Sequence, residues 1–386
     1  MDSVLVAGAG PVGLAAANVL ADSGVPVTVL EAQPRLPENL RASTFQPPTL
    51  DMLARFGASQ RLIEMGRVAP RLQYRDRAGW VAEFDFGVIA RDTHHPFRVQ
   101  CEQFKLNQVL AERLERIEFR SEVTAVEQDA DGVTVTLNDA RRLRAGWLIG
   151  ADGGRSRVRE ALGIPLEGFT WPERFLVAST PFDFAGALPG LCDVSYFADP
   201  EEWFFLLRVP GVWRAMFPVR DGEQDEQALS DASIQARLQR VHKRTPPYEL
   251  THRTLYSVHQ RVAQRYRKGR CFLAGDAAHL NNPLGGMGMN GGIHDGFNIA
   301  EKLVRVIRAG APDALLDAYE RQRRPVALEY VNRITIENKR NLEARDPDAH
   351  RRWKRDMVRA AADPVLAREY LLKISMLASL RRSECE

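Results

Sequence analysis

A glycine-rich turn near the start of the chain constrains the fold more than any other feature. Gly8, Gly10 and Gly13 have a G-x-G-x-x-G spacing, and the acid Glu31 ends the second apolar run after them. "SVLVAG" and "VPVTVLE" have the composition of buried strands, and "GLAAANVLADSG" between them has that of a helix. The sequence therefore predicts a β-α-β unit, the context in which this spacing indicates dinucleotide binding.

Each residue of this unit has a physical reason if a dinucleotide binds there. Gly8 permits a tight turn, Gly10 lets the backbone approach a pyrophosphate, and Gly13 lets the helix pack on the strand. A helix beginning at Pro11 presents free N–H groups and a partial positive charge to phosphate. Glu31 is expected to bind a ribose diol and to repel a 2′-phosphate, which favours NAD or FAD.

Two later stretches also run from a buried strand into glycines. In "LIGADGGRSRVREALGI" the strand is followed by Asp152 and Arg155, a pattern that also fits an ordinary strand-to-helix turn. "GRCFLAGDAAH" leads to Gly275 and Asp276, and a glycine-rich loop over residues 283–292 follows. We expect the loop backbone to lie flat against a planar ligand and Asp276 to bind a polyol hydroxyl.

The remaining pattern divides the chain into regions. Helices are expected at 47–57 and 101–115, an antiparallel hairpin turns at Asp131-Gly132, and Pro325 is expected to break or kink a helical segment. The predicted fold class is α/β, with a Rossmann-like nucleotide-binding domain, an inserted β-rich domain and a helical C-terminal region. The nucleotide-binding domain is expected at 1–75, 98–167 and 257–330, and the inserted β-rich domain at 76–97 and 168–256. The helical C-terminal region is expected at 331–386.

Composition excludes several classes of function. A hydrophobic content of 45%, a charged content of 27% and a net charge of +3 are those of an ordinary globular protein and favour neither nucleic acid nor membrane as a partner. The four cysteines have no C-x-x-C spacing, so no metal site or disulfide framework is predicted and a cytoplasmic location is expected. No apolar run reaches the roughly 18 residues of a membrane span.

The three glycine-bearing stretches, with "AYERQRRPVA" at 318–327, resemble the single-component FAD-dependent aromatic hydroxylases, the class A flavoprotein monooxygenases similar to para-hydroxybenzoate hydroxylase. The resemblance covers most of the chain. It implies non-covalent FAD kept between turnovers, NADH or NADPH that docks transiently, O2, and a small phenolic or N-heteroaromatic substrate. It also implies hydroxylation through a flavin C4a-hydroperoxide.

The resemblance assigns roles to individual residues. Glu31 would bind the adenosine ribose, Arg41 the pyrophosphate, Gln103 the flavin side chain and Asp276 the ribityl chain. The motif around Asp152 and Arg155 would serve both FAD and the nicotinamide. The expected FAD-binding residues are Gly8, Gly10, Pro11, Val12, Gly13, Glu31, Ala32, Arg41, Gln103, Asp152, Arg155, Gly275, Asp276, Pro283, Gly286, Gly288, Met289 and Asn290.

The β-rich insert is the expected wall for an aromatic substrate, although sheet core is the favoured role for any single aromatic. The aromatics in question are Tyr196, Phe197, Trp203, Phe204, Phe205 and Trp213, and the catalytic candidates are Tyr196, Arg214, His279 and Pro283. Three polar residues have structural alternatives: bracing the loop is the alternative role of His279, while Arg208 and Arg214 are favoured as charges at a sheet edge. His294 is expected to be structural.

Other functions remain open at this point. A flavoprotein reductase or dehydrogenase, or a tailoring oxidase of a non-phenolic substrate, would share the nucleotide motifs. A flavin halogenase is disfavoured because no W-x-W-x-I-P stretch occurs. A flavin-binding partner that needs another subunit is a non-catalytic alternative, and a homodimer is a possible assembly.

Overall fold

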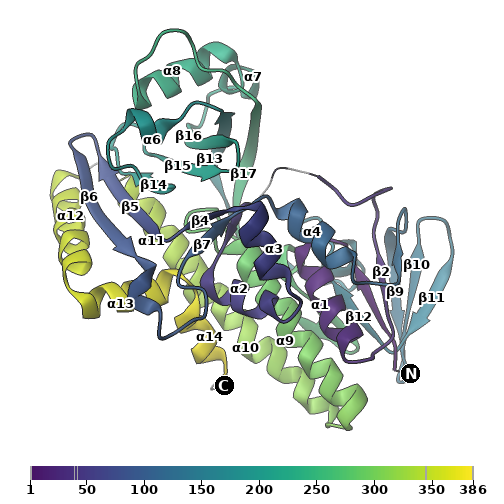
Figure 1. Ribbon diagram of the computed structural model, residues 1–386. Helices are drawn as coiled ribbons and strands as arrows, with labels where there is room; N and C mark the ends of the chain where they lie inside the picture. Colours follow the sequence, from purple (N-terminus) through teal and green to yellow (C-terminus); the bar gives the residue numbers. More distant parts are fainter. Residues whose placement is uncertain (1, 39, 41, 344–345, 385–386) are drawn as a thin grey trace.

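Two large β-sheets organise the computed structural model, which describes residues 2–38, 40, 42–343 and 346–384. One sheet has six strands in the order β18-β19-β12-β1-β2-β8, and the other has eight in the order β20-β17-β13-β16-β15-β14-β5-β6. In Figure 1 the six-stranded sheet lies on the right, behind α1 and α4, and most of the eight-stranded sheet lies at the top, below α8. Arg41 lies outside the described residues.

The six-stranded sheet contains the predicted β-α-β unit. Its central strands are buried apolar runs, as parallel strands covered on both faces require. Helix α1 (Pro11–Asp22) connects β1 to β2 and packs on α9 (Gly288–Ala309). The strands are β1 (Val4–Ala7), β2 (Val27–Leu30), β8 (Ile117–Glu118), β12 (Trp147–Gly150), β18 (Arg267–Lys268) and β19 (Cys271–Leu273), of which only β18 is antiparallel to its neighbour.

The predicted antiparallel hairpin is confirmed. Strands β9 (Val123–Gln128), β10 (Val133–Leu137) and β11 (Arg142–Ala145) form a separate three-stranded sheet. The N–H of Asp129 donates to the carbonyl of Gly132 at 3.0 Å and closes the turn. Along β10 buried and half-buried residues alternate, which is the period expected for a sheet with one covered face.

The eight-stranded sheet begins earlier in the chain than the sequence predicted. Strand β5 pairs with β6 and with β14, so residues 71–75 belong to this sheet and not to the nucleotide-binding domain. Strand β17 likewise continues past the predicted boundary at 256. The local sequence pattern does not reveal the pairing of β5, because its partner β14 follows more than a hundred residues later. The strands are β5 (Arg71–Asp76), β6 (Gly79–Asp85), β13 (Leu166–Thr180), β14 (Val194–Phe197), β15 (Phe204–Val209), β16 (Val212–Val219), β17 (His252–Ala263) and β20 (His279–Leu280).

A second small sheet and several helices complete the part of the chain before α9. The small sheet has the order β3-β7-β4, and the predicted helices at 47–57 and 101–115 are α2 and α4. The elements are β3 (Thr44–Phe45), α2 (Pro47–Ala54), α3 (Ala58–Met65), β4 (Arg67–Ala69), η1 (Phe86–Ile89), β7 (Arg98–Gln100), α4 (Gln103–Ala111), α5 (Arg157–Ala161), α6 (Phe184–Ala187), α7 (Asp225–Ala228), α8 (Asp231–Val241) and η2 (Gly275–Ala277).

The chain after α9 is helical, as predicted. It stays helical through Pro325, but a π-helical segment follows at once, because proline cannot donate a backbone hydrogen bond. Helices α12 and α13 pack against β6 and η1 and appear in yellow at the left of Figure 1. The elements are η3 (Asp313–Leu316), α10 (Asp317–Pro325), η4 (Val326–Asn332), α11 (Arg333–Leu342), α12 (Pro347–Ala362), α13 (Pro364–Ile374) and α14 (Leu377–Glu384).

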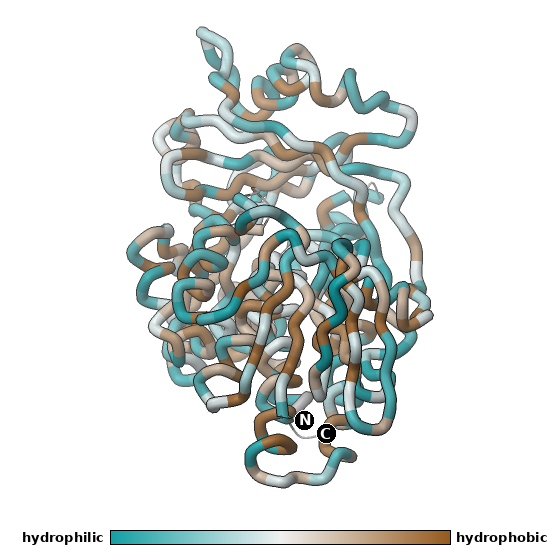
Figure 2. Tube along the Cα trace, turned by 90° about the vertical axis from the view of Figure 1, so that its right-hand side faces the viewer, coloured by the Kyte–Doolittle hydropathy of each residue, from teal (hydrophilic) through white to brown (hydrophobic). Residues whose placement is uncertain are grey.

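The buried apolar residues form three clusters, one around the six-stranded sheet and one on each face of the eight-stranded sheet. Figure 2 shows hydrophobic residues along the interior strands and hydrophilic residues on many outer loops. Among the described residues no helix is long and apolar enough to cross a membrane.

Candidate FAD site and active site

The first turn has the close contacts that its glycines predict. A Cβ on Gly8 would lie 2.4 Å from the carbonyl oxygen of Ala151, and one on Gly13 would lie 2.1 Å from the carbonyl oxygen of Gly8. A Cβ on Gly10 would meet nothing within 4 Å. Gly8 and Gly13 therefore allow strand and helix to pack, whereas Gly10, the N-cap of α1, borders open space in front of the helix N-terminus.

Glu31 fixes this turn from the end of β2. It is 8% exposed, and its carboxylate accepts the N–H of Ala9 at 2.8 Å and the N–H of Gln33 at 2.9 Å. Each oxygen keeps a further lone pair, because a carboxylate offers about four acceptor sites. The side chain can hold the backbone turn and still accept a hydrogen bond from a ribose.

A cavity of about 640 Å³ opens at this end of the six-stranded sheet. Its lining includes seven of the expected cofactor residues: Gly8, Gly10, Glu31, Ala32, Gln103, Asp152 and Arg155. Backbone N–H groups at a helix N-terminus, a free space at Gly10, a carboxylate and an arginine are the donors and acceptors that an adenosine diphosphate group requires. The residues present therefore fit the ADP half of FAD.

Asp152 holds the start of α5, which is the structural role left open for it. Its carboxylate accepts the hydroxyl of Ser156 at 2.5 Å and the N–H of Val158 at 3.0 Å. Burial raises the pKa of Asp152 above its ordinary value. Arg155 is exposed at the cavity, and no carboxylate in the described part of the chain pairs with it. Arg155 thus offers a positive charge to a phosphate in this cavity, which Arg35 and Arg157 also line.

The predicted flavin loop connects β20 to α9 and is held by Asn290 and Gln46. The Asn290 amide donates to the carbonyls of Thr44 at 2.8 Å and Gly286 at 2.7 Å, and it accepts the N–H of Gln46 at 2.9 Å. Gln46 donates in turn to the carbonyl of Gly285 at 2.8 Å. The side chain of Asn290 therefore shapes the loop from within, and Gln46 is a supporting residue that sequence reasoning missed.

Several glycines of the third stretch serve helix packing, a role that the sequence did not predict. A Cβ on Gly275 would lie 2.7 Å from the side chain of Val12, and one on Gly292 would lie 2.9 Å from the Cα of Gly275. A Cβ on Gly296 would lie 2.7 Å from the carbonyl oxygen of Val12. These glycines bring α9 and η2 against α1, and Asp276, next to Gly275, stays exposed.

A buried ionic network lies behind the loop. Asp295 accepts the N–H of Gly275 at 3.2 Å, Nε2 of His279 at 2.7 Å and Nε of Arg323 at 2.7 Å. Burial alone would raise the pKa of Asp295, but the charges of Arg323 and His279 outweigh it and lower the pKa. His279 thus has a structural contact with α9, and its catalytic role stays a prediction. Arg323 comes from the "AYERQRRPVA" stretch.

His294 is buried and structural, as expected. Its Nε2 lies 2.8 Å from the hydroxyl of Thr49. Burial, with the charge of Arg323, lowers the pKa of His294 from 6.5 to about 3. The ring is therefore neutral at every pH near 7.

The aromatic residues of the insert divide between the two faces of its sheet. Tyr196, Trp203 and Phe205 join the cluster that contains Leu284 and Met287 of the flavin loop. The others, Phe197, Phe204 and Trp213, join the cluster on the opposite face. Because successive side chains of a strand point to opposite faces, only the first three can form a wall toward the flavin.

Three phenols meet on the flavin-loop face. The rings of Tyr74 and Tyr196 stack with centroids 5.4 Å apart, and the hydroxyls of Tyr74 and Tyr370 are 2.7 Å apart. Burial raises the pKa of Tyr74 and of Tyr370, so both phenols are neutral. Tyr74 and Tyr370 were not assigned roles from the sequence, because they are separated by most of the chain.

The expectation that Arg214 and Arg208 are edge charges is wrong. Strands β15 and β16 are interior strands of the eight-stranded sheet. Arg214 is 6% exposed, and its guanidinium lies 3.4 Å from the carboxylate of Glu102, at the start of α4. The half-buried Arg208 lies 3.5 Å from Asp183. Arg214 thus connects the substrate-side sheet to the segment that carries Gln103.

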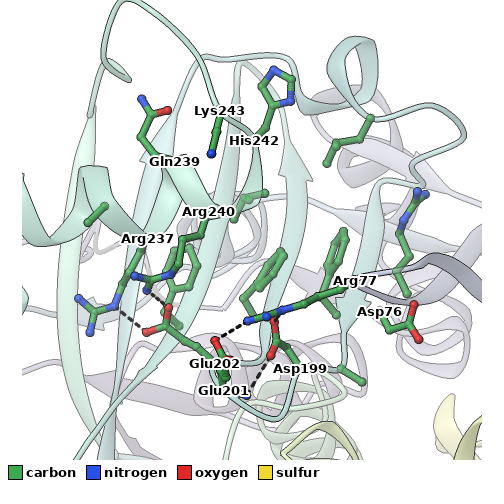
Figure 3. A pocket seen from close by; sticks show the side chains of 18 of the residues that line it. Asp76, Arg77, Asp199, Glu201, Glu202, Arg237, Gln239, Arg240, His242 and Lys243 are labelled. Carbon is green, nitrogen blue, oxygen red and sulfur yellow. Dashed lines mark hydrogen bonds and ion pairs between the residues drawn. The ribbon is translucent and has the colours of Figure 1, made fainter.

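A larger cleft, of about 1100 Å³, lies on the opposite face of the insert; Phe197 and Phe204 line it, but none of the predicted catalytic or FAD-binding residues does. Its charged walls neutralise one another, as Figure 3 shows: Arg77 lies 2.6 Å from Asp199 and 2.7 Å from Glu201, and Arg237 lies 3.2 Å from Glu202. These ion pairs explain how the walls are held together.

Comparison with known proteins agrees with this geometry. The sequence model of the family described as "FAD binding domain" matches residues 1–334. The para-nitrophenol 4-monooxygenase of Pseudomonas sp. strain WBC-3 is 35% identical, over 99% of this chain and 97% of that protein. The 6-hydroxy-3-succinoylpyridine 3-monooxygenase of Pseudomonas putida strain S16 is 32% identical, over 89% of this chain and 90% of that protein.

A search of solved structures also finds an aromatic monooxygenase with a similar fold. The crystal structure of p-nitrophenol 4-monooxygenase from Pseudomonas putida DLL-E4 superposes with a TM-score of 0.92 at 32% identity, over 98% of each chain. The resemblance inferred from the three glycine-bearing stretches is thereby confirmed. The chain belongs to the FAD binding domain family and is an FAD-dependent aromatic monooxygenase.

Proposed function

We propose that this protein hydroxylates a small phenol with an electron-withdrawing substituent in the para position, using O2 and a reduced nicotinamide. The observation that supports this most directly is the phenol cluster of Tyr74, Tyr196 and Tyr370, which packs in one apolar cluster with Leu284 and Met287 of the flavin loop. The relatives named for p-nitrophenol match almost the whole chain.

The chain's own residues would bind FAD and orient the substrate. Glu31, the first turns of α1 and Arg155 would hold the ADP half of FAD, and Asp276 would hold its ribityl chain. Bound FAD supplies the chemistry, namely electron transfer from the nicotinamide and activation of O2. The loop from Pro283 to Asn290 would offer backbone N–H groups to the flavin ring. The apolar cluster on the sheet would exclude water and orient the substrate ring.

Substrate-stimulated turnover tests this proposal. Purified protein loaded with FAD is mixed with NADH or NADPH and 4-nitrophenol in air, and nicotinamide oxidation, O2 consumption and products are followed together. We expect 4-nitrophenol to stimulate nicotinamide oxidation and to yield a product that contains one oxygen atom from labelled O2. Nicotinamide oxidation that reduces the substrate without incorporating labelled oxygen would instead favour a reductase.

The remaining predictions belong to this proposal as well. The eight-stranded sheet would be the substrate domain. We infer no preference between NADH and NADPH from Glu31, because the nicotinamide would dock without its own Rossmann unit, near Arg155. The homodimer and the cytoplasmic location stay predictions.

A further inference from the structure

Arg98 is a buried cation whose charge no acid in the described part of the chain balances. It lies on β7, the central strand of the small sheet, and is 1% exposed. Its Nε donates to the side-chain oxygen of Gln46 at 3.0 Å. Among the described residues no carboxylate forms an ion pair with Arg98. A buried charge without a partner is strongly unfavourable, so its retention calls for a ligand.

The position of Arg98 is between the flavin loop and the phenol cluster. Gln46, which accepts its hydrogen bond, also donates to the carbonyl of Gly285 in the loop. The guanidinium carbon lies 5.3 Å from the ring centroid of Phe86, which belongs to the same apolar cluster as Tyr74 and Met287. Arg98 therefore joins the two regions between which the aromatic substrate would lie.

The nearby phenols do not neutralise Arg98. Burial raises the pKa of Tyr74 and of Tyr370, and although the positive charge of Arg98 opposes this effect, both pKa values stay above the ordinary one. Two other buried arginines have acidic partners: Arg214 lies beside Glu102, and Arg323 beside Asp295. Arg98 differs from them because its aromatic and amide neighbours carry no negative charge.

We propose that Arg98 binds the ionised oxygen of a phenolate substrate and thereby selects phenols that ionise readily. This inference rests on the proposed function. An ionised phenol has a more electron-rich ring than the neutral phenol, which is the form that electrophilic oxygen transfer requires. A guanidinium pairs well with an anionic oxygen in a water-poor site, because it cannot be deprotonated there. Phenols without an electron-withdrawing group would bind more weakly.

Binding in the absence of nicotinamide tests Arg98 without turnover. The FAD-loaded wild type, Arg98→Met and Arg98→Lys are titrated with 4-nitrophenol, whose phenolate absorbs visible light and whose neutral form does not. Nitrobenzene, which cannot ionise, is the matched ligand. Arg244→Met is the matched control, since Arg244 lies 4.7 Å from the ring centroid of Phe182 in the outer part of the insert.

We expect the wild type to bind 4-nitrophenol as the phenolate. Arg98→Met should weaken this binding about ten- to hundredfold, the range for a hydrogen bond to a charged group, and shift the bound ligand to its neutral form. Arg98→Lys should retain part of the phenolate signal. Nitrobenzene binding, FAD content and circular dichroism should stay as in the wild type, and Arg244→Met should behave as the wild type does.

Three results would overturn the inference. The first is phenolate binding by Arg98→Met that equals that of the wild type. The second is an equal loss of 4-nitrophenol and nitrobenzene, which would show that Arg98 only supports the fold of the pocket. If Arg98→Met does not fold, Arg98→Gln replaces it and is read by the same criteria. The third is a wild type that hydroxylates 4-nitrophenol but binds it neutral, a result that leaves the proposed function intact. A wild type that binds no phenol contradicts both.

Discussion

At the scale of single residues, the glycines of the first turn have two separate physical roles. Gly13 has no room for a side chain, because its Cβ would lie 2.1 Å from a backbone oxygen. Gly10 has room and an ordinary backbone conformation, with φ of −78°. One position therefore serves the fold, and the other serves the ligand that would approach the helix N-terminus.

Alanine substitutions should separate these roles. We expect Gly13→Ala to lower the free energy of unfolding by about 1–3 kcal/mol or more, because the backbone must shift to accept the methyl group. Gly10→Ala should leave thermal unfolding of the FAD-free protein unchanged and weaken FAD binding. Calorimetry of the FAD-free protein and fluorescence titration with FAD measure the two effects. Equal loss of stability in both variants would contradict the assignment.

Asp276 is a second residue at which an effect on FAD binding can be separated from an effect on the fold. It is exposed beside the buried Gly275. If its carboxylate binds ribityl hydroxyls, Asp276→Ala should weaken FAD binding by about 1.5–3 kcal/mol, the range for a charged hydrogen bond. Circular dichroism of the FAD-free protein should not change. An FAD-free variant that is unfolded would show that Asp276 is structural.

At the scale of elements, α9 joins the loop to the core through buried ionisable residues. His294 bonds Thr49 of α2, and Asp295 bonds Gly275, His279 and Arg323. Both residues are buried, so their protonation states are coupled to folding. The pH dependence of stability should therefore report on this helix.

His294 should make the protein less stable in mild acid. Its pKa is about 3 in the folded protein and 6.5 as the ordinary value, so between these limits the unfolded chain binds a proton that the folded chain does not. Its contribution to stability is full above pH 6.5 and falls as the pH decreases, by up to about 1.4 kcal/mol per pH unit. His294→Gln should reduce the slope of unfolding free energy against pH between 6 and 4.

Chemical denaturation of wild type and variant at several pH values measures this slope. The comparison uses the difference between the two proteins, which removes the contribution of carboxylates that titrate in the same range. His94→Gln is a suitable control, because the His94 side chain is exposed. Parallel curves for the wild type and His294→Gln would contradict the prediction.

At the scale of the whole molecule, the proposed substrate site is assembled from distant segments. Tyr370 of α13 reaches Tyr74 of β5 across the apolar cluster. Tyr370→Phe should keep the fold, since it removes one hydroxyl and about 1 kcal/mol of hydrogen bonding. We expect it to retain FAD but to form less hydroxylated product per nicotinamide oxidised, because the wall of the substrate site is altered. Product and hydrogen peroxide are quantified together, and unchanged coupling would contradict a role for Tyr370.

The local sequence determined the β-α-β unit, the hairpin at Asp131-Gly132 and the positions of α2 and α4. Each of these depends on contacts between residues close in the chain, and hydrophobic period and turn chemistry encode such contacts directly. The glycine spacing with Glu31, together with the family resemblance that assigned Gln103, Asp152 and Arg155, predicted seven residues that line one cavity. The FAD-dependent hydroxylase family followed from three stretches read together.

Only the tertiary structure decided which of the candidate substrate-site residues lie together. Strand pairing placed β5 in the second sheet, buried Arg214 beside Glu102 and separated the aromatics of the insert onto two faces. The proposed roles of Arg98 and Tyr370 rest on contacts with residues that lie far away in the chain. The hydrophobic period of a sequence predicts which side chains share a face. What packs against that face depends on contacts between residues far apart in the chain. The same long-range contacts determine whether a buried charge has a counter-ion.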